Sequence, residues 1–450
     1  MDIIEIISQY DNNEIKLPPS PVSFINIREV NETVDTFDEI LHLQSSCSQP
    51  FEATGVFKYA IEKYRIIAQG DDIKSVYDLT LNTNSSIDHM FNPGDTVGIL
   101  TRNFKEDVTF LLKHLDLVSA SDNILRVEID PSTKKKAAKL PPYIPSIVQI
   151  GKLFEECLDL KAIPKKLFLR ALLNHTTDEL ERKFLSLLCS KEGHVYDDVI
   201  LESRLGFVTL LKSLPNCKPP ISVLIEHLPR LMPRPYSIAN YHDGPGMVGK
   251  LRVIFSLNDE QPGLTTTMLK NCCINGDPIF LYFRKPTRFT YTDEDVQNDA
   301  VMIGVGTGIA PYLSFLEKRS KAVNSNSLGK TWLFAGFRYE QCNYLCRDEL
   351  EQYMKTNMLN NLSVAFSRDP RAQFRYVQDQ MEANKEELVQ MLCGSDCKLF
   401  VCGDGKKMLP QIERKFAEMI GGVQGIGLDE SINLIADFKK NQKYVEDIWL

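Results

Sequence analysis

Residues 300–311 have the sequence Ala300-Val301-Met302-Ile303-Gly304-Val305-Gly306-Thr307-Gly308-Ile309-Ala310-Pro311. A short apolar run is followed by closely spaced glycines, which let a backbone approach a pyrophosphate, and then by Pro311, a favourable residue for the first turn of a helix. A helix that begins there points its positive end at bound phosphates. A lone Gly-x-Gly is also common in plain tight turns, but the order of strand, glycine turn and helix predicts a dinucleotide site.

The residues after this motif alternate between apolar and helical segments. Short apolar runs occupy 331–335, 362–366 and 398–401, and stretches with helical spacing separate them. Such alternation is typical of a parallel sheet whose faces are covered by helices. We therefore predict an α/β parallel-sheet domain over residues 296–450, with its ligands at the carboxyl ends of the strands.

The residues before the motif carry other patterns. Strand-like segments around the turn Phe91-Asn92-Pro93-Gly94-Asp95 predict an antiparallel β-barrel, with 51–103 as its first part and 232–295 as its second. Between them, 104–231 shows helical i, i+3, i+4 spacing, so we predict an α-helical insertion. Residues 1–50 are polar and contain prolines, which predicts a linker or surface arm. The predicted fold class is therefore multidomain.

Composition excludes several classes of protein. The chain has 450 residues, too many for one core, and its formal net charge of −8 opposes nucleic-acid binding, which needs clustered positive charge. No run approaches the ~18 apolar residues of a membrane span, and the first residues lack the pattern of a signal peptide. Eleven cysteines scattered through so long a chain favour a reducing compartment, so we expect a cytoplasmic protein.

Two cysteine pairs have the spacing Cys-x-x-x-Cys, namely Cys342 with Cys346 and Cys393 with Cys397. Either pair could supply half of a zinc site. No histidine stands beside either pair at ligand spacing, however, and a structural zinc needs four ligands. We therefore expect ordinary buried thiols and no metal.

The apolar run at 362–366 is followed by residues suited to a phosphate. Arg368 can bind a phosphate through two parallel hydrogen bonds, and the hydroxyl groups of Ser367 and Tyr376 can donate to it. An NAD site would instead place a carboxylate on the ribose. The pattern favours NADPH, and the alternative is a solvated surface arginine.

Two earlier segments suit a flavin. In Arg234-Pro235-Tyr236-Ser237 the arginine suits a pyrophosphate, the tyrosine ring can stack on the isoalloxazine, and the serine hydroxyl can reach its N5 edge. The segment Gly263–Leu269 adds a glycine turn with hydroxyl groups at the start of a predicted helix, which is a second phosphate cradle. Either segment alone is as well explained by ordinary structure.

Together with Val401-Cys402-Gly403-Asp404 and the aromatic segment Asp447-Ile448-Trp449, these motifs resemble the ferredoxin-NADP reductase-type half of the diflavin reductases, over about residues 55–450. The resemblance implies FAD and NADPH as cofactors, with Tyr236 and Trp449 on opposite faces of the flavin. It implies that Ser237, Cys402 and Asp447 surround the transferred hydride, and that Trp449 acts in catalysis as a movable lid on the flavin. The residues implied to hold FAD are Arg234, Pro235, Tyr236, Ser237, Ile254, Phe255, Ser256, Gly263, Leu264, Thr265, Thr266 and Trp449. Those implied to hold NADPH are Lys58, Thr307, Ser367, Arg368, Arg375, Tyr376 and Gln378.

The chain departs from the family pattern at four places. Val305 replaces a common proline, Gln411 replaces a common NADP-contacting aspartate, Leu450 replaces a serine, and one residue is inserted between Ser367 and Tyr376. None of these departures removes a catalytic group. No segment resembles a flavodoxin-like FMN domain, so FMN is expected only on a missing domain or on a separate protein.

Within the family, three segments of the insertion (130–145, 162–172 and 226–229) resemble the branch that reduces the cobalamin of methionine synthase. The resemblance implies hydride transfer from NADPH to FAD, single-electron transfer to FMN, and methionine synthase as a partner. Two alternatives stay open. One is the corresponding module of a cytochrome or sulfite reductase, and the other is a docking or chaperone partner of methionine synthase without turnover.

Overall fold

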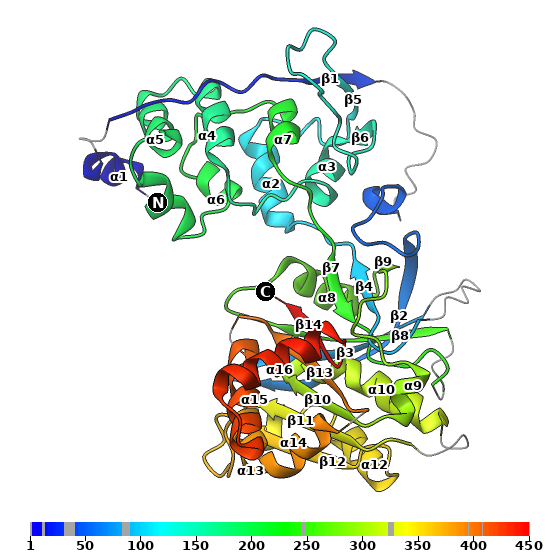
Figure 1. Ribbon diagram of the computed structural model, residues 1–450. Helices are drawn as coiled ribbons and strands as arrows, with labels where there is room; N and C mark the ends of the chain where they lie inside the picture. Colours follow the sequence, from blue (N-terminus) through cyan, green and yellow to red (C-terminus); the bar gives the residue numbers. More distant parts are fainter. Residues whose placement is uncertain are drawn as a thin grey trace. The chain divides into compact units, whose positions relative to one another are not determined.

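The computed structural model describes residues 2–10, 14–30, 41–82, 91–244, 246, 249–322, 328–394, 396–406 and 408–449. The chain divides into two compact units, both drawn in Figure 1. Unit 1 comprises Met1–Gln49 and Leu100–Arg234, and unit 2 comprises Pro50–Ile99 and Pro235–Leu450. Each unit is therefore built from two separate segments of the chain.

Unit 1 is mainly helical, and its helices surround a core that includes the fully buried side chains of Phe154 and Leu224. Helix α5 shows how the sequence produces this packing. The Asp178 carboxylate caps its first turn, and Phe184 and Leu188 lie on its buried face. The helical segments are α1 (Ile3–Gln9), η1 (Leu43–Ser46), α2 (Lys105–His114), α3 (Ile150–Glu156), α4 (Lys166–Leu172), η2 (Leu173–His175), α5 (Glu179–Cys189), η3 (Asp197–Leu201), α6 (Phe207–Leu211) and α7 (Ile221–His227).

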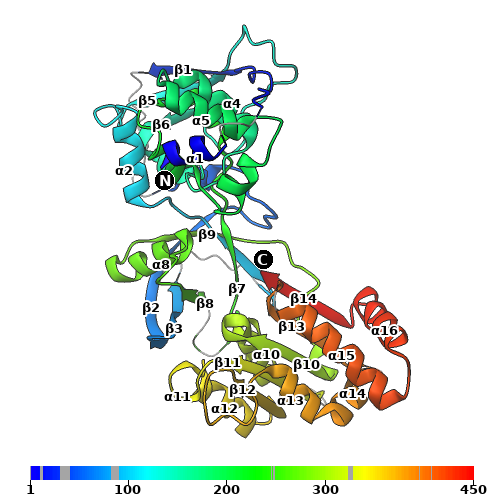
Figure 2. The same cartoon turned by 90° about the vertical axis from the view of Figure 1, so that its left-hand side faces the viewer.

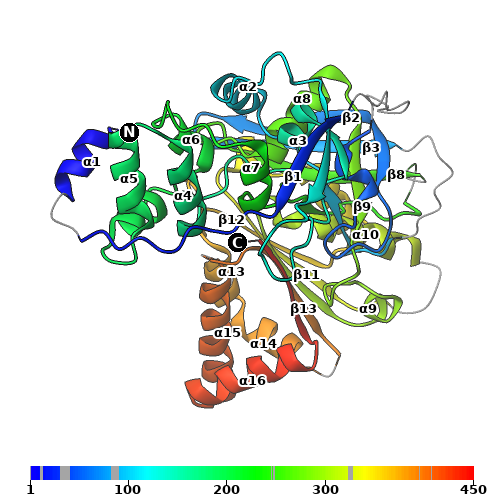
Figure 3. The same cartoon turned by 90° about the horizontal axis from the view of Figure 1, so that it is seen from above.

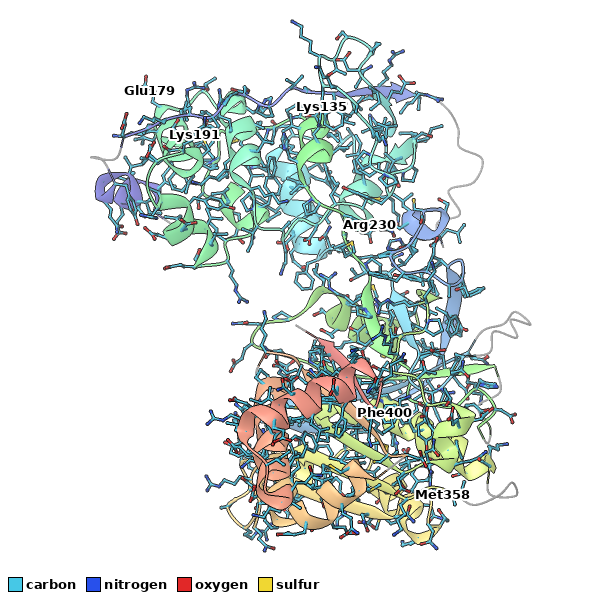
Figure 4. The ribbon with its side chains drawn as sticks, viewed as in Figure 1. Lys135, Glu179, Lys191, Arg230, Met358 and Phe400 are labelled. Atoms are coloured by element: carbon cyan, nitrogen blue, oxygen red, sulfur yellow. The ribbon has the colours of Figure 1, made fainter. Side chains whose placement is uncertain are left out.

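A small antiparallel sheet in unit 1 ties residues before position 50 to the insertion. Its strands are β1 (Ile25–Val30), β5 (Ile124–Ile129) and β6 (Ile147–Gln149), in the order β1-β5-β6. Beside β1, the ammonium group of Lys135, labelled in Figure 4, lies 3.3 Å from the centroid of the Phe24 ring. The prediction of a linker or surface arm over 1–50 did not anticipate this pairing, because the partner strand lies far along the chain.

The barrel of unit 2 is a six-stranded sheet in the order β7-β4-β9-β2-β3-β8. A bridge between Ile238, directly after β7, and Val253 of β8 joins the two ends of this sheet into a ring. Leu79 and Leu81 of β3 are fully buried in its interior. The predicted barrel with a helical insertion is confirmed. The strands are β2 (Phe57–Gly70), β3 (Ile73–Asn82), β4 (Thr96–Ile99), β7 (Arg234–Ser237), β8 (Lys250–Leu257) and β9 (Ile279–Phe283).

The predicted turn before β4 depends on Gly94. Its φ is +97°, a left-handed conformation that favours glycine. A Cβ at this position would lie 1.9 Å from the carbonyl oxygen of Phe289, so a side chain does not fit either. The Asp95 carboxylate closes the turn by accepting a hydrogen bond of 2.8 Å from the backbone N–H of Asn92.

The second part of unit 2 is a five-stranded parallel sheet in the order β12-β11-β10-β13-β14. Alternate residues of β10 serve two cores. Val301 and Ile303 pack against α13 to α16, whereas Ala300 and Met302 pack with α10, α12 and the barrel residue Ile254. Figures 2 and 3 show α14, α15 and α16 together on one side of the sheet. The predicted parallel-sheet domain is confirmed.

The strands of this sheet are β10 (Ala300–Val305), β11 (Thr331–Phe337), β12 (Asn361–Phe366), β13 (Lys398–Asp404) and β14 (Tyr444–Trp449). The helical segments of unit 2 are α8 (Leu264–Asn275), α9 (Asp293–Gln297), η4 (Gly306–Ile309), α10 (Ala310–Lys321), α11 (Glu340–Asn343), α12 (Arg347–Lys355), α13 (Val377–Ala383), α14 (Lys385–Cys393), α15 (Met408–Gln424) and α16 (Leu428–Lys440).

A charged cluster joins the barrel to helix α12. Arg252 of β8 donates from Nε to Oδ1 of Asp78 at 2.7 Å and from Nη1 to Oε2 of Glu349 at 2.8 Å. Arg65 of β2 donates to the same two carboxylates. Burial opposes the charge on Asp78, but the bonds from Arg252 and Arg65 outweigh it and hold the pKa of Asp78 below its usual value. The cluster therefore links strands of the barrel to a helix of the parallel-sheet domain.

The part of the chain that the structure describes contains neither a membrane-spanning helix nor a metal-binding cluster. No helix there combines the length and apolar character needed to cross a bilayer. No group of three or more histidine, cysteine, aspartate or glutamate side chains there is placed to hold a metal ion. In the two Cys-x-x-x-Cys pairs, the side chains of Cys346 and Cys397 are buried and that of Cys342 is exposed.

Candidate active site

The register of the parallel sheet brings predicted site residues into one row. Gly304 of β10 lies opposite Cys402 of β13, and Cys402 lies opposite Asp447 of β14. Two residues further along, Asp404 lies opposite Trp449. The strands are parallel, so this row lies at the carboxyl edge of the sheet, where ligands bind in α/β domains.

The glycine motif closes against this row. A Cβ at Gly308 would lie 2.4 Å from the carbonyl oxygen of Cys402 and 3.5 Å from Cη2 of Trp449, so only glycine permits this approach. The backbone of Trp449 is held in place, because its carbonyl oxygen accepts a hydrogen bond of 3.0 Å from the N–H of Gly405. Helix α10 follows with Pro311 in its first turn. The motif, Cys402 and Trp449 therefore meet at one place.

A hydrogen bond joins barrel strand β7 to the same row. The Ser237 hydroxyl donates to Oδ2 of Asp447 at 2.7 Å. Burial is the main influence on Asp447 and raises the pKa of its carboxyl group, while Ser237 and Arg284 partly oppose this shift. Asp447 keeps some solvent exposure. A carboxylate placed in this way interacts strongly with any positive charge brought beside it.

Cys402 is fully buried beside Asp447, and burial raises the pKa of its thiol well above the usual value. The thiol therefore stays protonated at neutral pH, whereas a nucleophilic cysteine needs a lowered pKa. This environment suits a residue that sets a packing distance.

The segment predicted to carry the flavin lies on β7. Tyr236 is half-buried against the barrel core and Pro235 is exposed. Arg234 begins the strand, and its Nη1 donates to the carbonyl oxygen of Met232 at 2.6 Å. Tyr236 and Ser237 thus follow one another on a strand whose serine already contacts Asp447.

The predicted residues of β8 point in different directions. Phe255 turns into the barrel core, where its ring stacks on Tyr77 with 5.0 Å between the centroids. Ile254 turns the opposite way, into the core shared with the parallel sheet, and Ser256 is partly exposed. The ring of Phe255 is therefore occupied by the barrel, and its backbone is the part left to contact a flavin.

The second predicted phosphate cradle is the start of α8. Gly263 caps the helix, which begins at Leu264. Thr266 donates from its hydroxyl to the carbonyl oxygen of Gly263 at 3.2 Å. The hydroxyl oxygens of Thr265 and Thr267 are buried and have no hydrogen-bond partner among the described residues. A buried hydroxyl group without a hydrogen-bond partner costs folding free energy. Two such hydroxyl groups beside a helix N-terminus can donate to the pyrophosphate of FAD, so they fit the predicted cradle.

Replacing Thr265 by valine is expected to weaken FAD retention by about fivefold, the value of roughly one hydrogen bond. The unfolding temperature of the flavin-free protein should not fall, because this hydroxyl has no partner to lose among the described residues. Flavin fluorescence released on dialysis and a melting curve measure the two effects. Equal retention in wild type and Thr265→Val would count against the cradle.

The residues predicted to hold the 2′-phosphate follow β12. The N–H groups of Ser367 and Arg368 donate to the carbonyl oxygens of Phe337 and Arg338, both at 2.9 Å, which ties this segment to the end of β11. The guanidinium of Arg368 forms an ion pair with Asp72, in the turn between β2 and β3. The segment is therefore fixed at the carboxyl edge, with its cation facing a carboxylate.

The remaining predicted NADPH residues occupy nearby and more distant elements. Thr307 lies in η4, Arg375 and Tyr376 are exposed at the start of α13, and Lys58 is exposed on β2 opposite Phe280. Gln378 donates from Nε2 to Oε1 of Gln411 at 3.1 Å. Gln411, which departs from the family pattern, therefore lies beside Gln378, a predicted NADPH contact. Leu450, another departure, lies outside the described residues. Their contacts with a nucleotide remain predictions.

Sequence reasoning missed three residues at this edge, namely Asp72, Arg338 and Tyr339. Arg338 and Tyr339 follow β11 directly, so the rule that ligands bind at carboxyl ends of strands could have singled them out. Asp72 gave no such signal, because its contacts with β11 and β12 join residues far apart in the sequence.

Comparisons with known proteins identify two cofactor-binding domains in this chain. A family model for the FAD binding domain matches residues 49–253, and one for the oxidoreductase NAD-binding domain matches residues 302–414. Methionine synthase reductase from Homo sapiens is 31% identical over 91% of this chain and 64% of its own length. The Mus musculus protein of that name is 32% identical with the same coverage. The chain belongs to the diflavin reductase family.

Another relative has a different named activity. NADPH--cytochrome P450 reductase from Dictyostelium discoideum is 31% identical over 80% of this chain and 53% of its own length. The chain spans about two thirds of the length of the methionine synthase reductases that it matches, 64% to 68%. It carries the FAD-binding and NADPH-binding part of a flavoprotein reductase, and its cofactors are accordingly FAD and NADPH.

Proposed function

We propose that this chain transfers a hydride from NADPH to FAD at the row formed by Cys402, Asp447 and Trp449. The observation that carries the proposal is the 2.7 Å hydrogen bond from Ser237 to Asp447, beside the buried Cys402 and the glycine motif. Bound FAD supplies the redox chemistry, since a flavin accepts a hydride and gives up electrons singly. The chain supplies position and charge.

Each residue then has a distinct task. Asp447 provides a carboxylate whose partly desolvated charge stabilises positive charge on a nicotinamide. Ser237 orients that carboxylate and offers a hydroxyl to the flavin edge, and Cys402 sets the packing distance. Trp449, with 44% of its surface exposed, is free enough to act as a lid that yields to the nicotinamide. Proximity and orientation dominate a step of this kind.

Beyond FAD, we propose that electrons pass to FMN, on a flavodoxin-like domain or protein, and then to the cobalamin of methionine synthase. The support is the resemblance of the insertion and the names of the matching relatives. The second candidate is the corresponding module of a cytochrome reductase, which the Dictyostelium relative favours. A docking partner without turnover would not require Ser237, Asp447 and Trp449 to be assembled.

Anaerobic addition of NADPH to the purified, FAD-loaded chain tests the proposal. The flavin absorbance near 450 nm is expected to bleach, and a dye that takes single electrons should restore it. A chain that stays colourless and cannot be reconstituted with FAD would refute the proposed function. To separate the two acceptors, the rate of reduction of methionine synthase is compared with the rate of reduction of a cytochrome, both in the presence of an FMN protein.

Replacing Arg368 by alanine is expected to raise the KM for NADPH about 10- to 100-fold, since a hydrogen bond to a charged group is worth ~1.5–3 kcal/mol. The KM for NADH should change little, because NADH lacks the 2′-phosphate. Steady-state kinetics with both nucleotides measure the difference. Equal effects on NADPH and NADH would end the assignment of Arg368 to the phosphate.

A further inference from the structure

The turn between β2 and β3 places an acidic side chain against the carboxyl edge of the parallel sheet. The turn consists of Asp71 and Asp72. Both carboxylate oxygens of Asp72 lie within hydrogen-bonding distance of Nη1 of Arg368, and Oδ2 also accepts from the Tyr339 hydroxyl at 3.1 Å. Arg338 completes the set, with its Nη1 3.7 Å from Oδ1 of Asp72 and hydrogen-bonded to the carbonyl oxygen of the same residue.

These donors are those that a phosphate monoester requires. Two guanidinium groups and a phenol hydroxyl converge from the ends of neighbouring strands β11 and β12 on one anionic group. The hydrogen bond from Arg368 is the largest influence on Asp72 and lowers the pKa of its carboxyl group, so the group is ionised at neutral pH. The Asp72 carboxylate therefore pairs with the same guanidinium groups that would otherwise bind a phosphate.

The ion pair is also accessible. The side chains of Asp72 and Arg368 are 48% and 46% exposed. Solvent-exposed ion pairs are weak, so a dianionic phosphate can replace the carboxylate at small cost. Asp71, the other residue of the turn, is exposed as well.

We propose that Asp72 is a specificity-determining residue that occupies the 2′-phosphate position on Arg368, so that NADPH must displace it. This inference rests on the proposed function, in which Arg368 binds the 2′-phosphate of NADPH. NADH has no phosphate to place there and does not compete with Asp72. Asp72 therefore lowers the affinity for NADPH selectively, and its departure makes Arg338 and Tyr339 available to the phosphate.

Nucleotide binding to the FAD-loaded chain tests this inference without turnover. Isothermal titration with 2′,5′-ADP, which carries the phosphate, and with 5′-AMP, which lacks it, compares wild type with Asp72→Asn. The variant is expected to bind 2′,5′-ADP about two- to fivefold more tightly, the scale of one exposed ion pair, with unchanged affinity for 5′-AMP. Asp71→Asn is the matched control, since it removes the same charge one residue away and should shift 2′,5′-ADP affinity less.

Equal affinity of wild type and Asp72→Asn for 2′,5′-ADP overturns the inference. An equal gain in 2′,5′-ADP affinity in Asp71→Asn and Asp72→Asn also overturns it, because the gain would then come from the lower negative charge of the turn as a whole. Weaker binding of both nucleotides by Asp72→Asn also overturns it, because Asp72 would then be a structural tether. A wild-type chain that does not bind 2′,5′-ADP overturns this inference together with the phosphate assignment. Failure of NADPH to bleach the flavin, with the affinity shift intact, overturns only the proposed hydride transfer.

Discussion

Replacing Trp449 by alanine is expected to change the use of NADPH and NADH in opposite directions. An open face would let the nicotinamide of NADH reach the flavin without displacing a ring, so turnover with NADH rises. Turnover with NADPH falls, because no indole returns to expel the oxidised nicotinamide. The ratio of the two turnover numbers should change on the order of tenfold, since stacking of an aromatic ring is worth up to ~1.5 kcal/mol.

The structure gives Trp449 the freedom that this role requires. It lies near the end of β14, an edge strand of the sheet, with its indole beside the position that a Cβ of Gly308 would take. Steady-state turnover with each nucleotide measures the effect, and Trp449→Phe is the matched variant because it keeps a ring. Unchanged kinetics with both nucleotides would refute the lid.

Replacing Asp447 by asparagine is expected to slow flavin reduction by about 10²-fold or more, the usual effect of removing one group that stabilises a developing charge. Asparagine keeps an oxygen that can accept the hydrogen bond from Ser237, so the barrel contact is retained. Single-turnover reduction by NADPH, with bound nucleotide saturating, measures the step itself. Ser237→Ala should show a smaller loss, and a rate in Asp447→Asn equal to wild type would remove Asp447 from the mechanism.

The same carboxyl group should control the pH dependence of reduction and of stability. Burial raises the folded-state pKa of Asp447, so the charged form and the rate increase as the pH rises through that pKa. A raised pKa favours folding below the unfolded value of about 4 and loses that contribution as the pH rises through the folded value. Asp447→Asn should therefore melt at a higher temperature than wild type at neutral pH, and the difference should shrink under acidic conditions.

Much of the fold followed from local patterns in the sequence. The apolar runs at 300–303 and 398–401 proved to be strands β10 and β13, because buried parallel strands are apolar on both faces. Strand β14 was not predicted, since Tyr444 and Val445 are buried while Glu446 and the residues after it are partly or fully exposed. An edge strand of mixed polarity carries no strong periodic signal. Its pairing is set by the sheet that it joins.

The candidate site was predictable in its members more than in its geometry. The resemblance named Ser237, Cys402 and Asp447, and the structure brings these three together. Their proximity depends on strand register and on closure of the barrel, which no local segment encodes. Asp72 was missed for the same reason, because residues that meet only through tertiary folding show no characteristic spacing in the sequence.

The way the barrel closes has a consequence for how the chain is made. Strand β4 pairs with β7 and β9, and the bridge from Ile238 to Val253 completes the ring, yet residues 100–234 must be synthesised between these segments. At about 5–20 residues per second, β4 waits on the order of ten seconds with unsatisfied edges. The hairpin of β2 and β3 can form early, whereas the edges of β4 stay unpaired until β7 and β9 have been synthesised. Ribosome-bound chains in which β9 is still inside the exit tunnel and chains in which β9 has emerged should therefore differ sharply in their resistance to protease.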